Sequence, residues 1–207
     1  MRNQAGQVLI LLKKYLSRYS SEIQALAKML LNQRDSILEE FKQLLNRKIT
    51  AMRTRSHGHY SLKEVLYTGK DFIIIDFEGD TSRSLNERRM KRSPLRDVAS
   101  MLQSFYCVCS MALRNEKESG IIHTDKLPVM ERWSQFLFCW SSVAFLKAYF
   151  ANAGDATFLP QDKSELQVLL NTFILEKSIS QLDYELRNRP DWVEIALQRT
   201  LKLLEPI

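Results

Sequence analysis

One switch in hydrophobic period constrains the fold of this chain more than any other feature. Residues 3–52 and most residues after Pro94 carry apolar side chains at steps of three and four, which is typical of amphipathic helices. Between them, EVLYTG and FIIIDF are short, rich in β-branched and aromatic residues, and separated by TGKD. That pattern predicts a β-hairpin near residues 64–77 and is the one strong strand signal in the sequence. We therefore expect a mainly α fold with one β-hairpin.

The remaining helices and their breaks can also be placed. After the hairpin, periodic segments predict helices over four ranges, which are 95–113, 129–153, 162–179 and 192–204. Gly120, the run NAGDA and Pro160 supply the breaks between them. A length of 207 residues with 45% hydrophobic content predicts one domain with a substantial core. Its parts are a helical segment (1–55), a loop and hairpin (56–80) and a second helical region (81–207).

The chain is moderately basic, with a net charge of +6 and a pI near 9.2. Such a charge suits nucleic acid, membrane phosphates or a nucleotide. Acidic residues are interleaved almost everywhere, which favours an ordinary solvated surface. The densest basic run, SRSLNERRMKRSPLR, lacks the interleaved aromatic residues of a nucleic-acid patch, so we expect no nucleic-acid partner. Its basic residues are Arg83, Arg88, Arg89, Lys91, Arg92 and Arg96.

Cysteine usage and hydropathy predict a cytoplasmic protein. Cys107, Cys109 and Cys139 are odd in number and lack the spacing of a disulfide framework or a zinc site. The apolar run near the N-terminus ends at Lys13 and Lys14, which makes it too short to span a bilayer. No other segment reaches membrane length, so we expect no membrane partner.

Two carboxylates follow the second predicted strand. FIIIDFEG places Asp76 at the end of an apolar stretch and Glu78 two residues later, so alternation predicts both side chains on one side of the strand. Oxygen ligands of this kind bind hard cations such as Mg²⁺. An Asp before a glycine also serves simply to make a turn, and Gly79 permits a tight one. The upstream His57–Gly58 pair and the hairpin strengthen the metal interpretation, and both interpretations remain open.

Several motifs in order resemble one family. Three motifs look like those of the maltokinases, and most closely like the kinase portion of trehalose synthase–maltokinase fusions. In chain order they are HGHYSLKEVLYTGKDFIIIDFEGD, RSLNERRMKRSPLRDVASMLQSF and YELRNRPDW. The resemblance covers essentially the whole chain. It implies a protein-kinase-like, aminoglycoside phosphotransferase-like fold, of which this chain matches the C-terminal lobe. It also implies a reaction of ATP with maltose that gives maltose 1-phosphate, with Mg²⁺ as the metal.

The resemblance assigns roles to individual residues. His57 and Gly58 match the start of the family's catalytic loop, Asp76 matches the aspartate that binds Mg²⁺, and Glu78 matches a second carboxylate on the metal side. Three residues of the C-terminal motif are expected to border the sugar, namely Tyr184, Glu185 and Arg189. Arg96 and Asp97 match an element that we interpret as mainly a structural ion pair.

Four departures from the family fall within six residues. His59 stands where the family has its catalytic aspartate, and Glu64 stands where it has a glutamine that helps to hold metal. Ser61 and Lys63 replace a histidine and a glycine. The glycine-rich loop and phosphate-binding lysine of the family's N-lobe find no match before His57, so we expect an N-lobe to be absent from these residues.

These departures predict a chain that is inactive alone. A neutral imidazole at residue 59 accepts a proton near pH 7, but it offers no carboxylate beside Mg²⁺. Loss of a general base costs about 10²–10⁴ in rate, and loss of phosphate positioning costs more. A zinc or iron site built from His57, His59, Asp76 and Glu78 is a further alternative.

Two functions from different classes therefore remain open. The first is a maltokinase lobe that works with an N-lobe or a trehalose synthase polypeptide encoded separately. The second is a degenerate or pseudokinase module with no catalytic role. An apolar docking face, formed by the first helices and the hairpin, is expected to be exposed and to self-associate. Aromatic residues at helical spacing are interpreted as core, although one of them could stack on a sugar. They are Trp133, Phe136, Phe138, Trp140, Phe145 and Tyr149.

Overall fold

The computed structural model describes residues 1–45, 48–81, 84–120 and 123–205. The chain divides into two compact units. The first unit combines the two ends of the chain, Met1–Thr50 and Asp162–Ile207, and the second is Ala51–Gln161. Arg83 of the basic run lies outside the described residues.

The first unit is built from helices. Its elements are α1 (Arg2–Tyr15), η1 (Leu16–Arg18), α2 (Ser21–Asn32), α3 (Arg34–Leu45), α7 (Lys163–Asn188), η4 (Pro190–Trp192) and α8 (Val193–Leu204). Helix α7 begins where Asp162 Oδ1 accepts the backbone N–H of Glu165 (2.8 Å), a capping bond that satisfies one of the free N–H groups of the first turn. α7 packs against α1, α3 and α8, and α2 packs against α8.

The apolar stripes of these helices meet in one core. Helical spacing brings Ala5, Val8 and Leu12 to one face of α1, where all three are buried. The same core takes in buried residues from the other four helices, which include Leu30, Ile37, Leu182, Val193 and Leu197. Each large apolar side chain buried in this way contributes about 1.5–3 kcal/mol to folding, so this core accounts for much of the unit's stability.

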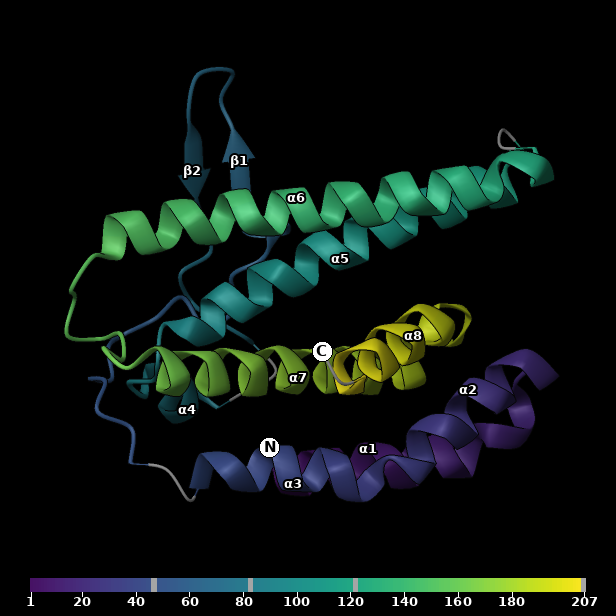
Figure 1. The fold of residues 1–207 in the computed structure, drawn as a ribbon, viewed down its shortest axis with the longest axis horizontal. Coiled ribbons are helices and arrows are strands. Elements are labelled where there is room, and N and C mark those ends of the chain that lie inside the picture. The colour runs from purple at the N-terminus through teal and green to yellow at the C-terminus, as the bar shows by residue number, and fades with distance from the viewer. Residues whose placement is uncertain (46–47, 82–83, 121–122, 206–207) are drawn as a thin grey trace. The chain divides into compact units, whose positions relative to one another are not determined.

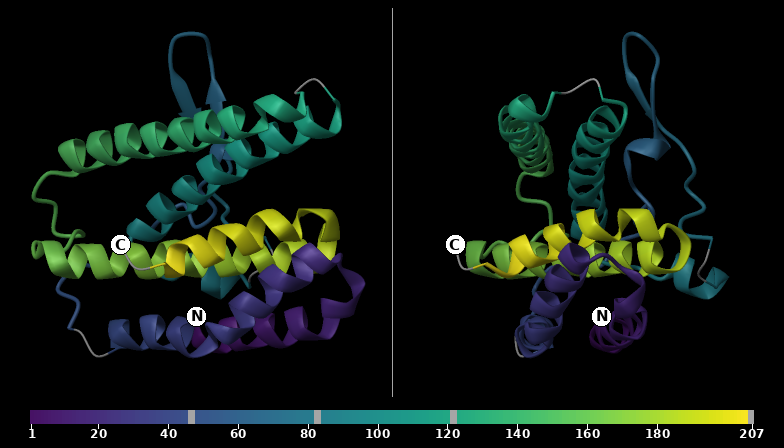
Figure 2. Two further views of the ribbon diagram at one scale, coloured as in Figure 1. Left: turned by 45° about the vertical axis from the view of Figure 1, so that its right-hand side comes forward. Right: turned by 90° about the vertical axis from the view of Figure 1, so that its right-hand side faces the viewer.

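The second unit carries the hairpin and two long helices. Its elements are η2 (Leu62–Glu64), β1 (Val65–Tyr67), β2 (Phe72–Ile74), α4 (Leu85–Arg89), α5 (Leu95–Glu118), η3 (Thr124–Lys126) and α6 (Leu127–Ala153). Helices α5 and α6 lie side by side and run in opposite directions (Figures 1 and 2). Aromatic edges join them, with Phe105 against Phe145 (5.7 Å between ring centroids) and Tyr106 against Phe138 (5.5 Å).

The predicted hairpin forms where the period-2 pattern placed it. β1 and β2 pair antiparallel in the register Val65–Ile74, Leu66–Ile73 and Tyr67–Phe72. The turn closes with a bond from Thr68 N–H to the carbonyl of Asp71 (2.9 Å). Among the described residues this is the one sheet, so the expectation of a mainly α fold with a single hairpin is confirmed.

Two expectations about the helices need correction. The helix predicted over 162–179 runs on to Asn188, because the residues up to Asn188 remain compatible with a helix and Pro190 is the first that ends it. The aromatic residues of 133–149 are not all core. Trp133, Phe136 and Trp140 are more than half exposed, because they lie on the side of α6 that α5 does not cover.

Exposed apolar side chains also occur elsewhere. The strands and the residues after them expose several, among them Tyr67, Phe72, Ile73 and Phe77, and the first helices expose Ile10 and Met29. Self-association through such surfaces stays a prediction. No helix in the described part of the chain is both long and apolar enough to cross a membrane.

Candidate functional site

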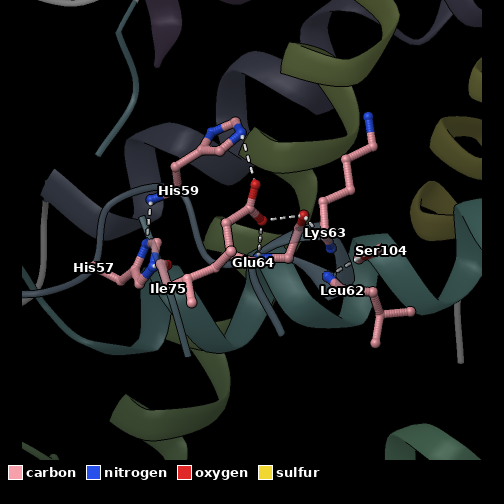
Figure 3. A network of polar contacts seen from close by, with 8 residues as sticks. His57, His59, Leu62, Lys63, Glu64, Ile75 and Ser104 are labelled. Carbon is pink, nitrogen blue, oxygen red and sulfur yellow. Dashed lines mark hydrogen bonds and ion pairs between the residues drawn. The ribbon is translucent and has the colours of Figure 1, made fainter. Parts of the chain in front are cut away.

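The His57 side chain links the predicted catalytic loop to the residue that follows β2. Its Nε2 lies 2.8 Å from the carbonyl oxygen of Ile75, and its Nδ1 lies 3.4 Å from the backbone nitrogen of His59 (Figure 3). A carbonyl only accepts and a backbone N–H only donates, so these contacts require the neutral tautomer with the proton on Nε2. The ring also lies against Phe77, with 5.0 Å between centroids. His57 is therefore a positioning residue here.

Asp97 holds the same loop from the other side. Its Oδ2 accepts the backbone N–H of His57 (2.7 Å) and its Oδ1 accepts that of Gly58 (2.9 Å). Asp97 lies in the first turn of α5, so the helix start fixes the carboxylate in place. Two hydrogen bonds to an ionised acceptor are among the stronger polar contacts in proteins. Burial, and to a lesser degree the negative charge of Asp97, raises the pKa of the neighbouring Tyr60.

Two glycines let the loop and the turn after the hairpin approach closely. Gly58 and Gly79 both have positive φ, at 84° and 78°. A Cβ added to Gly79 would stand 3.3 Å from the carbonyl oxygen of His57, and one added to Gly58 would stand 3.9 Å from the Cα of Gly79. Any larger residue at 79 would meet both backbone strain and this contact.

The four departures from the family pattern form one connected network. Glu64 Oε2 accepts the backbone N–H (3.0 Å) and the hydroxyl (2.5 Å) of Ser61, and the same hydroxyl accepts the backbone N–H of Lys63 (3.3 Å). His59 Nε2 lies 3.8 Å from Glu64 Oε1, an ion pair when the imidazole is protonated (Figure 3). Ser61 and Glu64 thus form a capping box at the start of η2, in which the Glu64 carboxylate is buried.

The two predicted metal carboxylates lie beyond the strand. β2 ends at Ile74, and Asp76 has a φ of 62°, so the alternation expected to place Asp76 and Glu78 on one side does not apply. Both residues are exposed. Arg88 approaches Glu78, with Nη1 3.8 Å from Oε2 and 3.3 Å from the backbone carbonyl.

The side chains near the loop offer few ligands for a metal ion. Across the described residues, no three His, Cys, Asp or Glu side chains gather to hold an ion, which includes the combination of His57 and His59 with the carboxylates. Mg²⁺ is held in many nucleotide sites by one or two carboxylates together with phosphate oxygens. Asp76 and Glu78 supply two exposed carboxylates of that chemical type, and Glu78 already has Arg88 as a neighbour. Glu64 offers no such ligand in this conformation, because its carboxylate is buried and its Oε2 accepts two bonds from Ser61.

The C-terminal motif forms a cluster of its own in the first unit. The Glu185 carboxylate is buried and accepts two bonds from Arg189, from Nε (2.9 Å) and Nη2 (2.6 Å), and a third from Gln181. The Arg189 guanidinium also lies 5.2 Å from the ring centre of Tyr184, which is half exposed. Glu185 and Arg189 therefore satisfy one another at the end of α7, and Tyr184 remains half exposed. A sugar-binding role for the three stays a prediction.

Two positioning residues were missed by sequence reasoning. The ion pair of Asp97 with Arg96 stays a prediction, and the structure adds that the Asp97 carboxylate oxygens hold the backbone of residues 57 and 58. Ser104 Oγ accepts the N–H of Leu62 (3.1 Å) and was not singled out at all. An acidic residue in the first turn of a helix, just after a loop, is a sequence signal for backbone capping. This signal identifies the carboxylate as an acceptor, but it does not identify backbone donors that lie 40 positions away in the sequence.

Comparison with known structures identifies the fold. Two crystal forms of glucosamine kinase superpose with TM-scores of 0.68 and 0.67, each at 17% identity, over 97% and 98% of this chain and 45% of theirs. A glucosamine kinase in complex with glucosamine, ADP and inorganic phosphate superposes with a TM-score of 0.68 at 15% identity, over 97% of this chain and 46% of that one. The chain has a kinase-like fold.

This likeness extends over part of those enzymes only. The chain spans less than half the length of the glucosamine kinases that it matches. A helical fold with one two-stranded sheet is consistent with the C-terminal lobe of a kinase. No family model matches the sequence. Identity at this level shows the fold, and the substrate has to be argued from the site.

Proposed function

We propose that this chain is a lobe of a maltokinase-like phosphotransferase, and that it supplies the catalytic loop and the residues after β2 that would bind the metal. We also propose that the chain does not phosphorylate maltose by itself. The kinase-like fold and the ordered motifs support the first half of the proposal. One observation carries the second half. His59, at the position of the family's catalytic aspartate, faces the Glu64 carboxylate at 3.8 Å.

The framework of the loop is what a phosphotransferase needs. Asp97 fixes the backbone of His57 and Gly58, and the His57 ring ties that backbone to Ile75. These contacts hold residue 59 at a defined place beside the strand that leads to Asp76. In the family reaction, the group at this place accepts the proton of the attacking sugar hydroxyl while the γ-phosphoryl group leaves ATP.

The reacting groups are changed within that framework. An imidazole at residue 59 can accept a proton in its neutral form, but when protonated its Nε2 is attracted to Glu64 and so to the side of η2. A carboxylate would keep its negative charge at neutral pH and orient the sugar hydroxyl. We infer that the sugar hydroxyl loses the carboxylate that would orient it in this chain, and that an imidazole facing Glu64 is a poor replacement for the base.

Metal and nucleotide binding are proposed from the same residues. Asp76 and Glu78 are the ligands that would hold Mg²⁺, with ATP phosphates completing its shell. Bound there, the ion would neutralise charge on the transferring phosphoryl group. Glu64 is left out of this set because Ser61 binds it twice. The phosphate-binding lysine would come from an N-lobe, and a trehalose synthase polypeptide is the other proposed partner.

Sugar recognition is proposed for the C-terminal cluster. Glu185 and Arg189 hold one another, so their role would be to fix the ring of Tyr184, whose half-exposed face could stack on a sugar. Maltose is the substrate that the family resemblance implies, and the cytoplasm is the proposed location.

A second function is favoured by the completeness of the His59–Ser61–Lys63–Glu64 network. Four changed residues that bind one another stabilise the loop without any ligand. A pseudokinase module, which keeps the fold as a binding scaffold and transfers no phosphate, would have this property.

The test measures activity and binding in parallel. Purified chain with maltose, ATP and Mg²⁺ is expected to form no maltose 1-phosphate above a control without protein. Isothermal titration is expected to detect weak maltose binding that Tyr184→Ala removes, with Tyr67→Ala as an exposed control on the hairpin. Turnover above the control would overturn the claim of inactivity. A folded chain that binds neither maltose nor nucleotide would support the pseudokinase alternative instead.

A further inference from the structure

Helix α6 is apolar on both of its long faces, yet none of its residues is buried. One face contacts α5, where Phe138 and Phe145 meet aromatic rings and Ser134 Oγ donates to the carbonyl of Cys109 (3.2 Å). These three residues are four and seven positions apart, so they share one side of the helix. A helix that is hydrophobic all round is normally covered on all sides, and the second face of α6 has no such cover.

This second face, called the outer face of α6, is continuous. It consists of exposed residues at helical spacing, namely Val129, Met130, Trp133, Phe136, Leu137, Trp140 and Val143. From residue 133 to residue 146 the helix contains no charged side chain. Its rings are already ordered against one another, with Trp133 edge-on to Phe136 (5.7 Å) and Phe136 stacked on Trp140 (6.1 Å, 9° between planes). Ordered rings lose little conformational entropy when a partner covers them.

The size of the outer face matches a stable interface. Its seven side chains are between about two-fifths and two-thirds exposed, and together they present on the order of 700 Å² of apolar surface. The largest apolar patch on a typical monomer measures about 300–600 Å². A specific interface buries about 800 Å² on each partner. The outer face is therefore too large for ordinary solvent exposure and large enough to bind a protein surface.

We propose that the outer face of α6 binds the same face of a second copy of this chain, as an antiparallel helix pair about a twofold axis. Four of the seven residues of the face are placed symmetrically about residue 138. Trp133 and Val143 are each five positions from it, and Phe136 and Trp140 are each two. A twofold axis at residue 138 would therefore set each large Trp133 ring opposite a small Val143, and Phe136 opposite Trp140, in both halves of the interface.

The identity of the partner follows from this symmetry and from the lack of charge. Interfaces with a different protein usually gain selectivity from charged groups at their rim, and α6 carries no charged side chain between residues 133 and 146. A second copy supplies an equally uncharged surface of matching length. A lipid surface and another protein are the competing occupants, and the experiment separates them.

The first experiment measures the mass of the full chain by sedimentation velocity over about 1–100 μM. The wild type is expected to pass from monomer to dimer across this range. Trp140→Glu places two charges near the twofold axis and is expected to weaken dimerisation at least 100-fold. Ile10→Glu is the matched control, because Ile10 is equally apolar and 71% exposed but lies on α1. Far-ultraviolet circular dichroism and thermal melting check that both variants remain folded.

The second experiment tests the geometry through a native thiol. Cys139 is exposed, free and one position from residue 138. Packed helices lie about 8–10 Å apart, so a bismaleimide with a spacer of about 10 Å is expected to join two chains through Cys139. Cys139→Ser is expected to abolish the product, while Cys107→Ser and Cys109→Ser leave it unchanged.

Three results would overturn the proposal. The first is a wild type that stays monomeric at 100 μM. The second is a dimer that persists in Trp140→Glu and dissociates in Ile10→Glu. The third is a monomer that binds neutral phosphatidylcholine vesicles in a way that requires Trp140, because the occupant would then be lipid. A concentration-dependent dimer that Trp140→Glu dissociates and Cys139 cross-links would support it.

Discussion

His59 Nε2 lies 3.8 Å from Glu64 Oε1, and Glu64 Oε2 accepts two bonds from Ser61. In the proposed maltokinase-like site, the residue that replaces the catalytic base therefore faces the residue that replaces a metal-binding amide. A change at either residue alters the charge that the other one meets. This coupling means that restoring a single residue of the family pattern should not restore its chemistry.

His59→Asp alone is expected to produce no maltose 1-phosphate and to lower the thermal midpoint. The new carboxylate would place a second negative charge on the side of the loop where His59 now faces the buried Glu64 carboxylate. Repulsion between two carboxylates in a half-exposed pair costs roughly 1 kcal/mol. Calorimetry of the variant measures the cost, with His59→Asn as a control that removes the imidazole and adds no charge. Equal melting of the two variants would show that Glu64 does not repel a negative charge at residue 59.

The double variant His59→Asp with Glu64→Gln, mixed with a maltokinase N-lobe, is expected to form maltose 1-phosphate. Glutamine keeps an oxygen acceptor for Ser61 N–H and removes the repelling charge. Restoring a positioned base is worth about 10²–10⁴ in rate. His59→Asn with Glu64→Gln plus the same N-lobe is the control without a base. Wild-type turnover as fast as that of the double variant would mean that His59 itself works as the base.

Asp97→Asn is expected to destabilise the second unit by about 2–3 kcal/mol. It replaces an ionised acceptor of two backbone bonds, from His57 and Gly58, by an amide whose nitrogen cannot accept. Denaturant unfolding measures the loss, and hydrogen exchange at the amides of residues 57 and 58 should accelerate. Asp183→Asn is the matched control, because its exposed pair with Arg187 on α7 is worth about 0.3–0.5 kcal/mol. A similar loss in both variants would contradict an anchoring role for Asp97.

Much of the fold could be predicted from the sequence, and the reasons are local. β-branched residues at period two located the hairpin at β1 and β2, and apolar steps of three and four located α5, α6 and α8 to within a few residues. The predictions that failed concern contacts between residues that are far apart in the sequence. Periodicity marks two apolar faces on α6 but does not tell which one a neighbour covers, so Trp133 and Trp140 were interpreted as core. The Asp97 bonds span 39 and 40 positions and leave no local pattern.

The candidate site, like the fold, could be predicted from the sequence only in part. Motif order placed His57 and Asp76 at the loop and after the strand. The left-handed backbone of Asp76 and the early end of β2 could not be read from alternation, which assumes that the strand continues. The Ser61–Glu64 capping box is a short-range pattern that the sequence displays, yet the family alignment assigned Glu64 to the metal. Local hydrogen bonding here supplied an explanation that the resemblance did not.

Tyr60→Phe is expected to reduce the loss of stability that the chain suffers in alkaline solution. Burial, followed by the charge of Asp97, raises the pKa of Tyr60 above 10.0. A raised folded-state pKa means that Tyr60 contributes stability below about pH 10, which is lost as the pH rises through the folded-state pKa. Unfolding free energies at pH 8 to 11, with Tyr67→Phe on the exposed hairpin as control, measure the effect. Identical alkaline slopes for Tyr60→Phe and the wild type would refute it.

Gly79→Ala is expected to cost more stability than Gly69→Ala, although both glycines have left-handed backbones. Their φ angles are 78° and 89°, so a methyl group meets a similar conformational penalty of about 1–2 kcal/mol at each position. At Gly69 nothing lies within 4 Å of the added Cβ, whereas at Gly79 the carbonyl oxygen of His57 lies 3.3 Å away. The difference between the two variants therefore isolates the close approach of the turn to the loop.

We expect about 1 kcal/mol of extra destabilisation for Gly79→Ala in denaturant unfolding, together with faster hydrogen exchange at Gly58, whose backbone lies beside Gly79. Equal unfolding free energies would mean that the loop moves away from the turn at no cost, and the framework proposed for the site would then be too loose to position residue 59.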